Sequence, residues 1–221
     1  MRHLNHPAYF ERAQDDFATL MRAIASPSIL GLAREILGEA PMFRCTSLFF
    51  NPIGESFEGE WHRDVQYEES DEAMQRKIIL ESGGSGRAVQ IQIALVPSAD
   101  VEIVPGSHLR WDTADEYAIR LGEGGRNNRS ALMPGAKRIA LAPGDVAVFN
   151  PNAVHRGRYH EDKPRRTLML TYLASSQTHC DWFSHQPWFL GDSYLERIPS
   201  DARPFFEAFV ERYRAFWLRE A

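Results

Sequence analysis

The clearest indication of the fold class of this 221-residue chain is the segment Lys137-Arg138-Ile139-Ala140-Leu141-Ala142-Pro143-Gly144-Asp145-Val146-Ala147-Val148-Phe149. It holds two short runs of strand-forming residues, 137–141 and 146–149, on either side of the turn residues Pro143-Gly144-Asp145. The pattern predicts a β-hairpin that leads towards His155. Short strands separated by tight turns are typical of a β-sandwich or a barrel, so we expect a mainly β fold.

Other strand-like runs lie on both sides of this segment. They span residues 42–50, 89–96, 101–104 and 167–173. Residues 51–54 and 82–86 predict turns between them, because both stretches consist mostly of turn-forming residues. In the run 89–96 the alternation places Gln90 and Gln92 on one face of the strand. That face is either exposed to solvent or lines a polar cavity.

Apolar residues take helical spacing near both ends of the chain and in one internal stretch. This spacing predicts helices over residues 7–25, 26–37, 113–121 and 203–218. We therefore expect a double-stranded β-helix, a cupin-like jelly roll, with flanking α-helices. A chain of this length commonly forms one domain, so residues 1–221 are predicted to form a single jelly-roll domain with N-terminal and C-terminal helices packed on the barrel.

The composition indicates which kinds of partner the protein can have. The chain has 25 Lys and Arg against 30 Asp and Glu, a net charge of −5, which argues against a nucleic-acid-binding surface and favours a small-molecule substrate. No apolar run is long enough for a membrane span, and the N-terminus has no apolar signal-peptide core, so we expect a cytoplasmic protein with no membrane partner. Cys45 and Cys180 form no CxxC pair, which predicts two reduced thiols. The oligomeric state is not indicated by any pattern.

The tripeptide His62-Arg63-Asp64 is the strongest candidate for chemistry. In an extended strand, side chains two residues apart project from the same face, so His62 and Asp64 can bind one metal ion while Arg63 points away. The distant His155 can complete one face of the coordination sphere, leaving positions open as in non-haem Fe(II) oxygenases and unlike closed zinc sites. The letters HRD also occur in protein kinases, but no Gly-rich loop precedes them and no DFG follows.

Several motifs in a fixed order give the tripeptide its context. They are His62-Arg63-Asp64, Val104-Pro105-Gly106-Ser107-His108, the run 142–150, His155-Arg156-Gly157, Pro164-Arg165-Arg166 and Tyr172. Together they resemble the phytanoyl-CoA dioxygenase family of Fe(II)/2-oxoglutarate-dependent oxygenases, over residues 43–172. The resemblance implies that His62, Asp64 and His155 are the catalytic residues and bind Fe(II).

The resemblance also implies that an arginine ten or eleven residues after the distal histidine holds the far carboxylate of 2-oxoglutarate. A guanidinium suits this role, because it grips a carboxylate with two parallel charge-assisted hydrogen bonds. Arg165 and Arg166 are neighbours on a strand and face opposite ways, and alignment with the family's motif favours Arg165. Gln90 and Gln92 are further candidates for binding the co-substrate.

The activity implied by the resemblance is oxidation of a C–H bond of a small molecule by O2, such as hydroxylation, with release of succinate and CO2. Asp64 favours oxygenation, because halogenating relatives replace this carboxylate with a small residue. Two alternatives stay open: a cupin-like metal protein without redox turnover, such as an isomerase or a ligand-binding or sensing module, and a non-catalytic homologue. His108 is predicted to fix a loop, and His160 is a reserve ligand. The substrate is not indicated, since one scaffold hosts many substrates.

Overall fold

The structure, a computed structural model, describes residues 3–51, 54–82, 87–177 and 181–219. Contacts between residues divide the chain into two compact units. Unit 1 comprises Met1–Ser47, Gly86–Val89 and Leu170–Ala221, and unit 2 comprises Leu48–Ser85 and Gln90–Met169. The predicted turn at residues 82–86 lies, from residue 83 on, outside the described residues, as does Cys180. Cys45 is a buried thiol.

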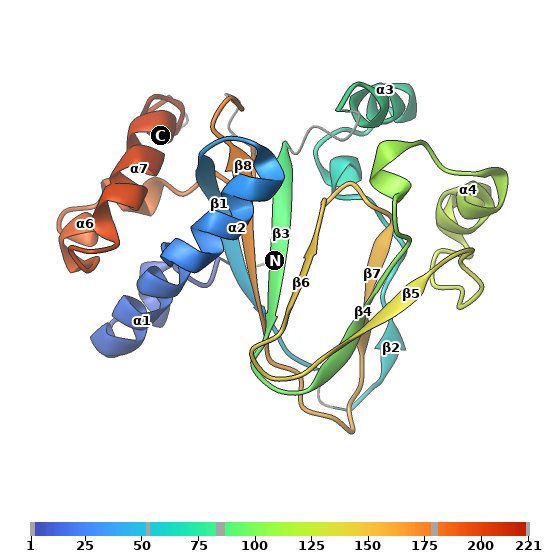
Figure 1. The fold of residues 1–221 in the computed structure, drawn as a ribbon, viewed down its shortest axis with the longest axis horizontal. Helices are drawn as coiled ribbons and strands as arrows, with labels where there is room; N and C mark the ends of the chain where they lie inside the picture. Colours follow the sequence, from blue (N-terminus) through green and yellow to red (C-terminus); the bar gives the residue numbers. More distant parts are fainter. Residues whose placement is uncertain (1–2, 52–53, 83–86, 178–180, 220–221) are drawn as a thin grey trace. The chain divides into compact units, whose positions relative to one another are not determined.

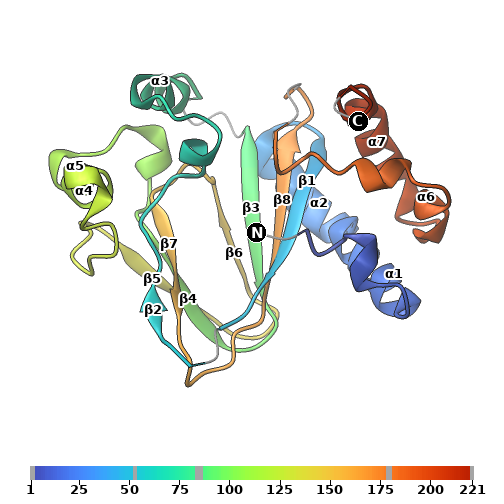
Figure 2. The ribbon, with the colours of Figure 1, turned by 180° about the vertical axis from the view of Figure 1, so that it is seen from behind.

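Within the described residues, eight strands form two four-stranded sheets (Figure 1). The first sheet has the order β1 (Pro41–Phe49), β8 (Thr167–Ala174), β3 (Ala88–Ala94), β6 (Val146–Phe149). The second has the order β2 (Phe57–Glu58), β7 (His155–Tyr159), β4 (Ser98–Ile103), β5 (Lys137–Leu141), and Figure 2 shows β2 beside β7 from behind. Strands that follow one another in sequence mostly alternate between the sheets, which is the topology of a jelly roll. The prediction of a mainly β jelly roll with added helices is confirmed.

The predicted hairpin at residues 137–149 is wrong, although both of its strands exist. Strand β5 pairs with β4, with Lys137 opposite Ile103, whereas β6 pairs with β3, with Phe149 opposite Gln90. The turn between them, at Gly144 with φ +91°, therefore carries the chain from one sheet to the other. A local pattern identifies strands and turns, but the partner of each strand depends on residues far away in sequence.

Strand β7 was not predicted as a strand, because its sequence His155-Arg156-Gly157-Arg158-Tyr159 lacks apolar alternation. Ion pairs with neighbouring strands balance its two arginines. Arg156 Nε donates to Glu102 Oε2 on β4 at 2.5 Å, and Arg158 Nη2 donates to Glu58 Oε1 on β2 at 2.5 Å. Strand β2 was not predicted either, because its two residues are too few to show an alternating pattern.

Unit 1 holds the terminal helices. They are η1 (Pro7–Tyr9), α1 (Gln14–Ile24), α2 (Pro27–Leu37), η4 (Pro187–Leu190), α6 (Tyr194–Arg197) and α7 (Arg203–Trp217). The helix predicted over residues 7–25 is divided in two, since Ala13 has the non-helical angles φ −136° and ψ 56°. Helix α2 ends as predicted at Gly38, whose φ is +73°. Helix α7 buries its aromatic face, with the ring of Phe209 5.2 Å from that of Phe43 on β1.

The remaining helices belong to unit 2. They are η2 (Asp64–Tyr67), α3 (Glu72–Ser82), η3 (Ser107–Leu109), α4 (Ala114–Arg120) and α5 (Gly122–Gly125). Helix α4 begins as predicted, with Thr113 and Glu116 forming a reciprocal cap. In α5, Glu123 and Gly124 have non-helical angles.

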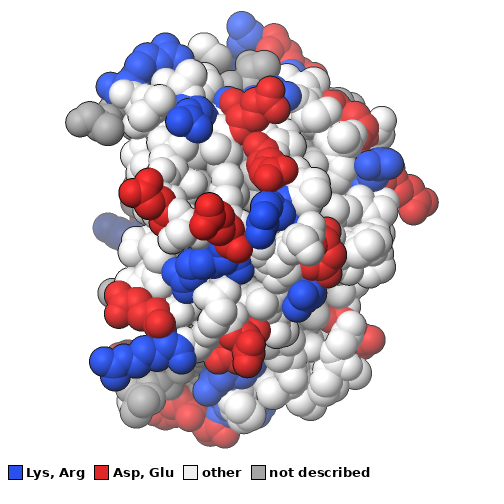
Figure 3. Space-filling model, turned by 90° about the vertical axis from the view of Figure 1, so that its left-hand side faces the viewer, with Lys and Arg blue, Asp and Glu red and all other residues white. Residues whose placement is uncertain are grey.

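Two properties of the chain bear on its partners. Within the described ranges, no helix combines the length and the apolar character that a bilayer crossing requires. The face drawn in Figure 3 carries basic and acidic side chains intermingled, without a continuous area of one sign.

Candidate metal centre

His62 and His155 face each other across a backbone bridge in unit 2. The His62 N–H donates to the His155 carbonyl at 3.0 Å, and the His155 N–H donates to the His62 carbonyl at 3.0 Å. Two residues that exchange both backbone bonds in an antiparallel pair carry their side chains on the same side. The imidazole centroids accordingly lie 4.2 Å apart.

Asp64 supplies the third donor from the same extended segment as His62. The segment does not continue as a strand, because Asp64 begins the 3-10 helix η2, but its side chain still lies on the side of His62. Asp64 Oδ1 is 3.7 Å from Nε2 of His62 and 3.7 Å from Nε2 of His155. These separations exceed hydrogen-bond lengths, so the donor atoms converge without bonding one another. Among the described residues, this is the group of His, Cys, Asp and Glu side chains that can hold a metal ion, with all ligand atoms within 4.8 Å.

Backbone carbonyls orient both imidazoles. Nδ1 of His62 lies 2.7 Å from the Glu60 carbonyl, and Nδ1 of His155 lies 2.9 Å from the Ala153 carbonyl. A carbonyl accepts only, so each Nδ1 carries the proton and each Nε2 presents its lone pair to the centre of the group. Burial holds the pKa of His155 well below its ordinary value, and the neighbouring His62 contributes to the lowering. The neutral imidazole is the form that binds a metal ion.

Gln90 holds the outer oxygen of the Asp64 carboxylate. Its Nε2 donates to Asp64 Oδ2 at 2.5 Å, while Oδ1 is the oxygen nearest the two histidines. Gln90 and Gln92 are 4% and 5% exposed, so the shared face of β3 points into the protein. Of the two alternatives for this face, the solvated one is therefore excluded.

Arg165 is buried and Arg166 is exposed, as predicted for adjacent residues. The Arg165 guanidinium carbon lies 5.0 Å from the ring centroids of both Phe49 and Tyr159. Its Nη1 donates to the Arg158 carbonyl at 3.2 Å, and its Nε is 3.8 Å from Asp100 Oδ2. The aromatic rings thus hold a guanidinium whose Nε has no hydrogen-bond partner within the described part of the chain.

Two buried donors, one on Arg165 and one on Thr167, fit an anionic ligand. In the described residues, Arg165 Nε, Thr167 Oγ1 and Gln92 Oε1 are buried without a hydrogen-bond partner. Such atoms are costly unless something else satisfies them. Thr167 is two residues after Arg165 and was missed by the sequence analysis, although this spacing on a strand places both side chains on one face. Arg165 Nε and Thr167 Oγ1 can both donate to a carboxylate, whereas Gln92 Oε1 is an acceptor and can only receive a hydrogen bond.

The other histidines of the motifs do not join this group. His160 lies beside Asp100, with Nε2 3.8 Å from Oδ1, so it is not brought to the three ligands. His108 belongs to the short helix η3 and is not one of the three converging ligands. Tyr67 was also missed: its ring centroid is 5.5 Å from that of His62, and its side chain is exposed, which places an aromatic surface at the edge of the site.

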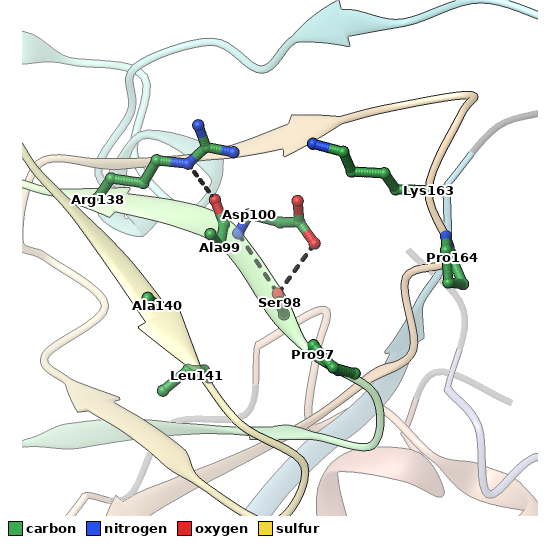
Figure 4. A pocket seen from close by; sticks show the side chains of 9 residues that line it. All are labelled: Pro97, Ser98, Ala99, Asp100, Arg138, Ala140, Leu141, Lys163 and Pro164. Carbon is green, nitrogen blue, oxygen red and sulfur yellow. Dashed lines mark hydrogen bonds between the residues drawn. The ribbon is translucent and has the colours of Figure 1, made fainter.

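A cavity of about 320 Å³ is lined by residues of β4, of β5 and of the chain just before Arg165 (Figure 4). Its charged lining residues are Asp100, Arg138 and Lys163. Arg138 Nε donates to the Ala99 carbonyl at 2.5 Å, and Ser98 Oγ donates to Asp100 Oδ2 at 2.9 Å. Asp100 is therefore fixed by β4 while it faces Arg165.

Comparison with solved structures finds the same fold. AviO1 from Streptomyces viridochromogenes Tue57 is 20% identical, with a TM-score of 0.53 over 75% of this chain and 66% of that chain. EctD from S. alaskensis with bound Fe is 22% identical, with a TM-score of 0.54 over 81% and 61%. SnoN, a non-heme alpha ketoglutarate dependent epimerase from nogalamycin biosynthesis, is 22% identical, with a TM-score of 0.50 over 74% and 59%. The match spans less than two thirds of the length of each of these proteins.

Sequence comparison assigns the family. No curated protein sequence matches the chain. The family model described as "Phytanoyl-CoA dioxygenase (PhyH)" matches residues 2–167, which is most of the chain and includes His62, Asp64, His155 and Arg165. The jelly-roll topology and the His-Asp-His group agree with this match. The chain belongs to the phytanoyl-CoA dioxygenase family.

Proposed function

We propose that the protein is an Fe(II)/2-oxoglutarate-dependent oxygenase that oxidises a C–H bond of a small molecule. The observation that carries the proposal is the convergence of His62 Nε2, Asp64 Oδ1 and His155 Nε2 within 4.8 Å in a protein of this family. Two imidazoles and a carboxylate on one face form the facial donor set of non-haem iron oxygenases. The EctD structure with bound Fe and the alpha ketoglutarate dependent SnoN are consistent with this use of the fold.

Each residue has a defined role in this proposal. His62, Asp64 and His155 hold Fe(II), and Gln90 keeps the Asp64 carboxylate in the orientation that presents Oδ1. Arg165 and Thr167 bind the far carboxylate of 2-oxoglutarate through their unused buried donors, and Gln92 on β3 is a further candidate for a contact with the co-substrate. When bound, the iron and the keto acid supply the oxidising chemistry, in which O2 oxidises the substrate while 2-oxoglutarate becomes succinate and CO2. The protein residues exclude water and orient the substrate, and Tyr67 offers it an aromatic contact at the edge of the site.

Anaerobic addition of Fe(II) and 2-oxoglutarate to the purified protein tests the proposal. A weak visible charge-transfer band is expected, and it is expected to disappear in His62→Ala and His155→Ala. In air the protein is expected to release succinate slowly, and faster when a screen of small metabolites supplies a substrate. Folded wild-type protein that neither shows the band nor releases succinate would refute the proposal.

Arg165 separates this function from a metal protein without redox turnover. Arg165→Ala is expected to weaken 2-oxoglutarate binding about 10- to 100-fold, since a buried charge-assisted contact is lost. Arg166→Ala is the matched control, because it removes the same side chain from the exposed neighbouring position. A cupin-like isomerase or sensing protein needs no keto acid, so its activity would be the same with and without Arg165.

A further inference from the structure

Arg63 lies between two of the three proposed iron ligands and has no exposed surface. Its backbone is extended, with φ −123° and ψ 137°, so its side chain leaves the segment on the side opposite His62 and Asp64. A buried arginine without a partner is very costly, so the surroundings of this guanidinium are informative. Nothing in the proposed function uses this residue.

Every donor of the Arg63 guanidinium is used. Its five N–H groups make five hydrogen bonds, of which Nε and Nη2 each give one to Asp112 Oδ1, at 3.0 and 2.7 Å. Backbone carbonyls accept the other three. These carbonyls belong to Ser107 at 2.8 Å, Asn152 at 2.6 Å and Arg110 at 3.3 Å. Lysine, with three donors at one point, cannot reproduce this set.

Two of these carbonyls connect Arg63 to the segment that carries the third ligand. Asn152 is three residues before His155, so the bond from Arg63 to its carbonyl directly holds the segment that leads into that histidine. Ser107 reaches the same segment through its hydroxyl, which accepts from the Val154 N–H at 2.8 Å. The guanidinium therefore joins the segment of His62 and Asp64 to the segment of His155 from behind the metal-binding group.

Asp112 fixes the guanidinium from its other side. Both side chains of the Arg63–Asp112 pair are 0% exposed. The second oxygen of Asp112 accepts from Arg120 Nε at 2.8 Å, and Arg120 Nη1 donates to Gln66 Oε1 at 3.1 Å. Gln66 lies two residues after Asp64, so the contacts lead from Arg63 through helix α4 back to helix η2.

We infer that Arg63 is a positioning residue, which together with Asp112 and Arg120 keeps the two ligand-bearing segments at the separation that the metal ion requires. The inference rests on the proposed function, because it concerns the iron site of that function. According to this inference, the hydrogen bonds of Arg63, which lie on the opposite side of the backbone from the ligands, help to set the affinity of the site for the metal ion. Partners of this kind, one step removed from the ligands, commonly change metal affinity when they are altered.

Metal titration of the full chain tests the inference without any enzymatic assay. Fe(II) alone is titrated anaerobically by calorimetry into wild type, Arg63→Lys and Asp112→Asn, and thermal unfolding of each metal-free protein is recorded. We expect the dissociation constant of both variants to rise about 10- to 100-fold. Circular dichroism at the titration temperature establishes that each variant is folded. If Arg63→Lys and Asp112→Asn do not fold, Arg120→Gln, which is one contact further from the ligands, decides the question.

Glu116→Gln is the matched control. Glu116, a residue of helix α4, is also a buried acid in a two-bond pair with an arginine, since Arg110 donates to its two oxygens at 2.6 and 2.7 Å. The Arg110 side chain does not join the ligand-bearing segments. Glu116→Gln is expected to lower the melting temperature while its Fe(II) affinity stays within about twofold of wild type. Wild-type affinity in a folded Arg63 or Arg120 variant overturns the inference, whereas a wild-type protein that binds no Fe(II) refutes the proposed function instead.

Discussion

Replacement of Gln90 by leucine isolates the hydrogen bond that orients the proposed carboxylate ligand. The bond from Gln90 Nε2 to Asp64 Oδ2 is 2.5 Å long, it has a charged acceptor, and both residues are buried. A bond of this kind contributes about 1.5–3 kcal/mol, and its loss leaves the carboxylate with one partner fewer. Each 1.4 kcal/mol of binding free energy corresponds to about a factor of ten in a dissociation constant. If the free energy of this bond is lost from Fe(II) binding, the dissociation constant for Fe(II) rises about 10- to 100-fold. Leucine keeps approximately the volume of glutamine, so packing of β3 is largely retained.

The assay is anaerobic Fe(II) titration, first without and then with 2-oxoglutarate. Gln92→Leu is the control, because Gln92 lies on the same face of β3 and is buried to the same degree, 5% against 4% exposed. Its loss is expected to leave Fe(II) affinity within about twofold of wild type and to weaken 2-oxoglutarate binding. Equal losses of Fe(II) affinity in the two variants would refute the reasoning, since the cause would then be disturbance of the strand and not the bond to Asp64.

Three further predictions concern packing and charge. Gly157→Ala places a methyl group 3.2 Å from Tyr159 Oη and 3.4 Å from Arg165 Nη1, so we expect weaker 2-oxoglutarate binding with nearly unchanged Fe(II) affinity, measured by the same titrations. Burial alone would raise the pKa of Asp181, but Arg44 at 2.8 Å and the bonds from Ser184 outweigh it and hold this pKa below its ordinary value. Because the pKa is lower in the folded state, the contribution of Asp181 to stability is present above pH about 4 and is lost as the pH falls further. Urea unfolding of Asp181→Asn should therefore show a loss of about 3–5 kcal/mol at pH 7 that shrinks towards pH 3, and a loss independent of pH would contradict it. Phe209→Ala removes a fully buried ring that contacts Phe43 and should cost about 3–5 kcal/mol in the free energy of unfolding, whereas a loss under about 1 kcal/mol would show that the site is not core.

Much of the local structure could be predicted, because local forces determine it. The strands at residues 42–50 and 167–173 and the helix end at Gly38 agree with β1, β8 and α2, since strand formers and a left-handed glycine act within a few residues. The proposed ligands were candidates from the sequence for a similar reason. In an extended segment, the spacing of His62 and Asp64 puts both side chains on one side of the backbone.

Other features depended on partners that are remote in sequence. Strand β7 has no apolar alternation, so its own sequence does not indicate a strand. Glutamates on β2 and β4 neutralise its arginines and allow it to pair there. The predicted hairpin at residues 137–149 failed for a related reason, because a turn does not specify whether the strands on its two sides pair with each other or with different sheets.

From the order of residues alone one can read which residue types are available for an iron site, which short segments are extended or helical, and to which family the motifs are similar. The folded structure was needed to show that His155 pairs with His62, that Gln90 reaches Asp64, and that the Arg63 guanidinium joins both ligand-bearing segments. This division follows from the range of the forces involved. Backbone preferences act between neighbouring residues, whereas a buried charge or amide is stable only where the folded chain brings its partners to it.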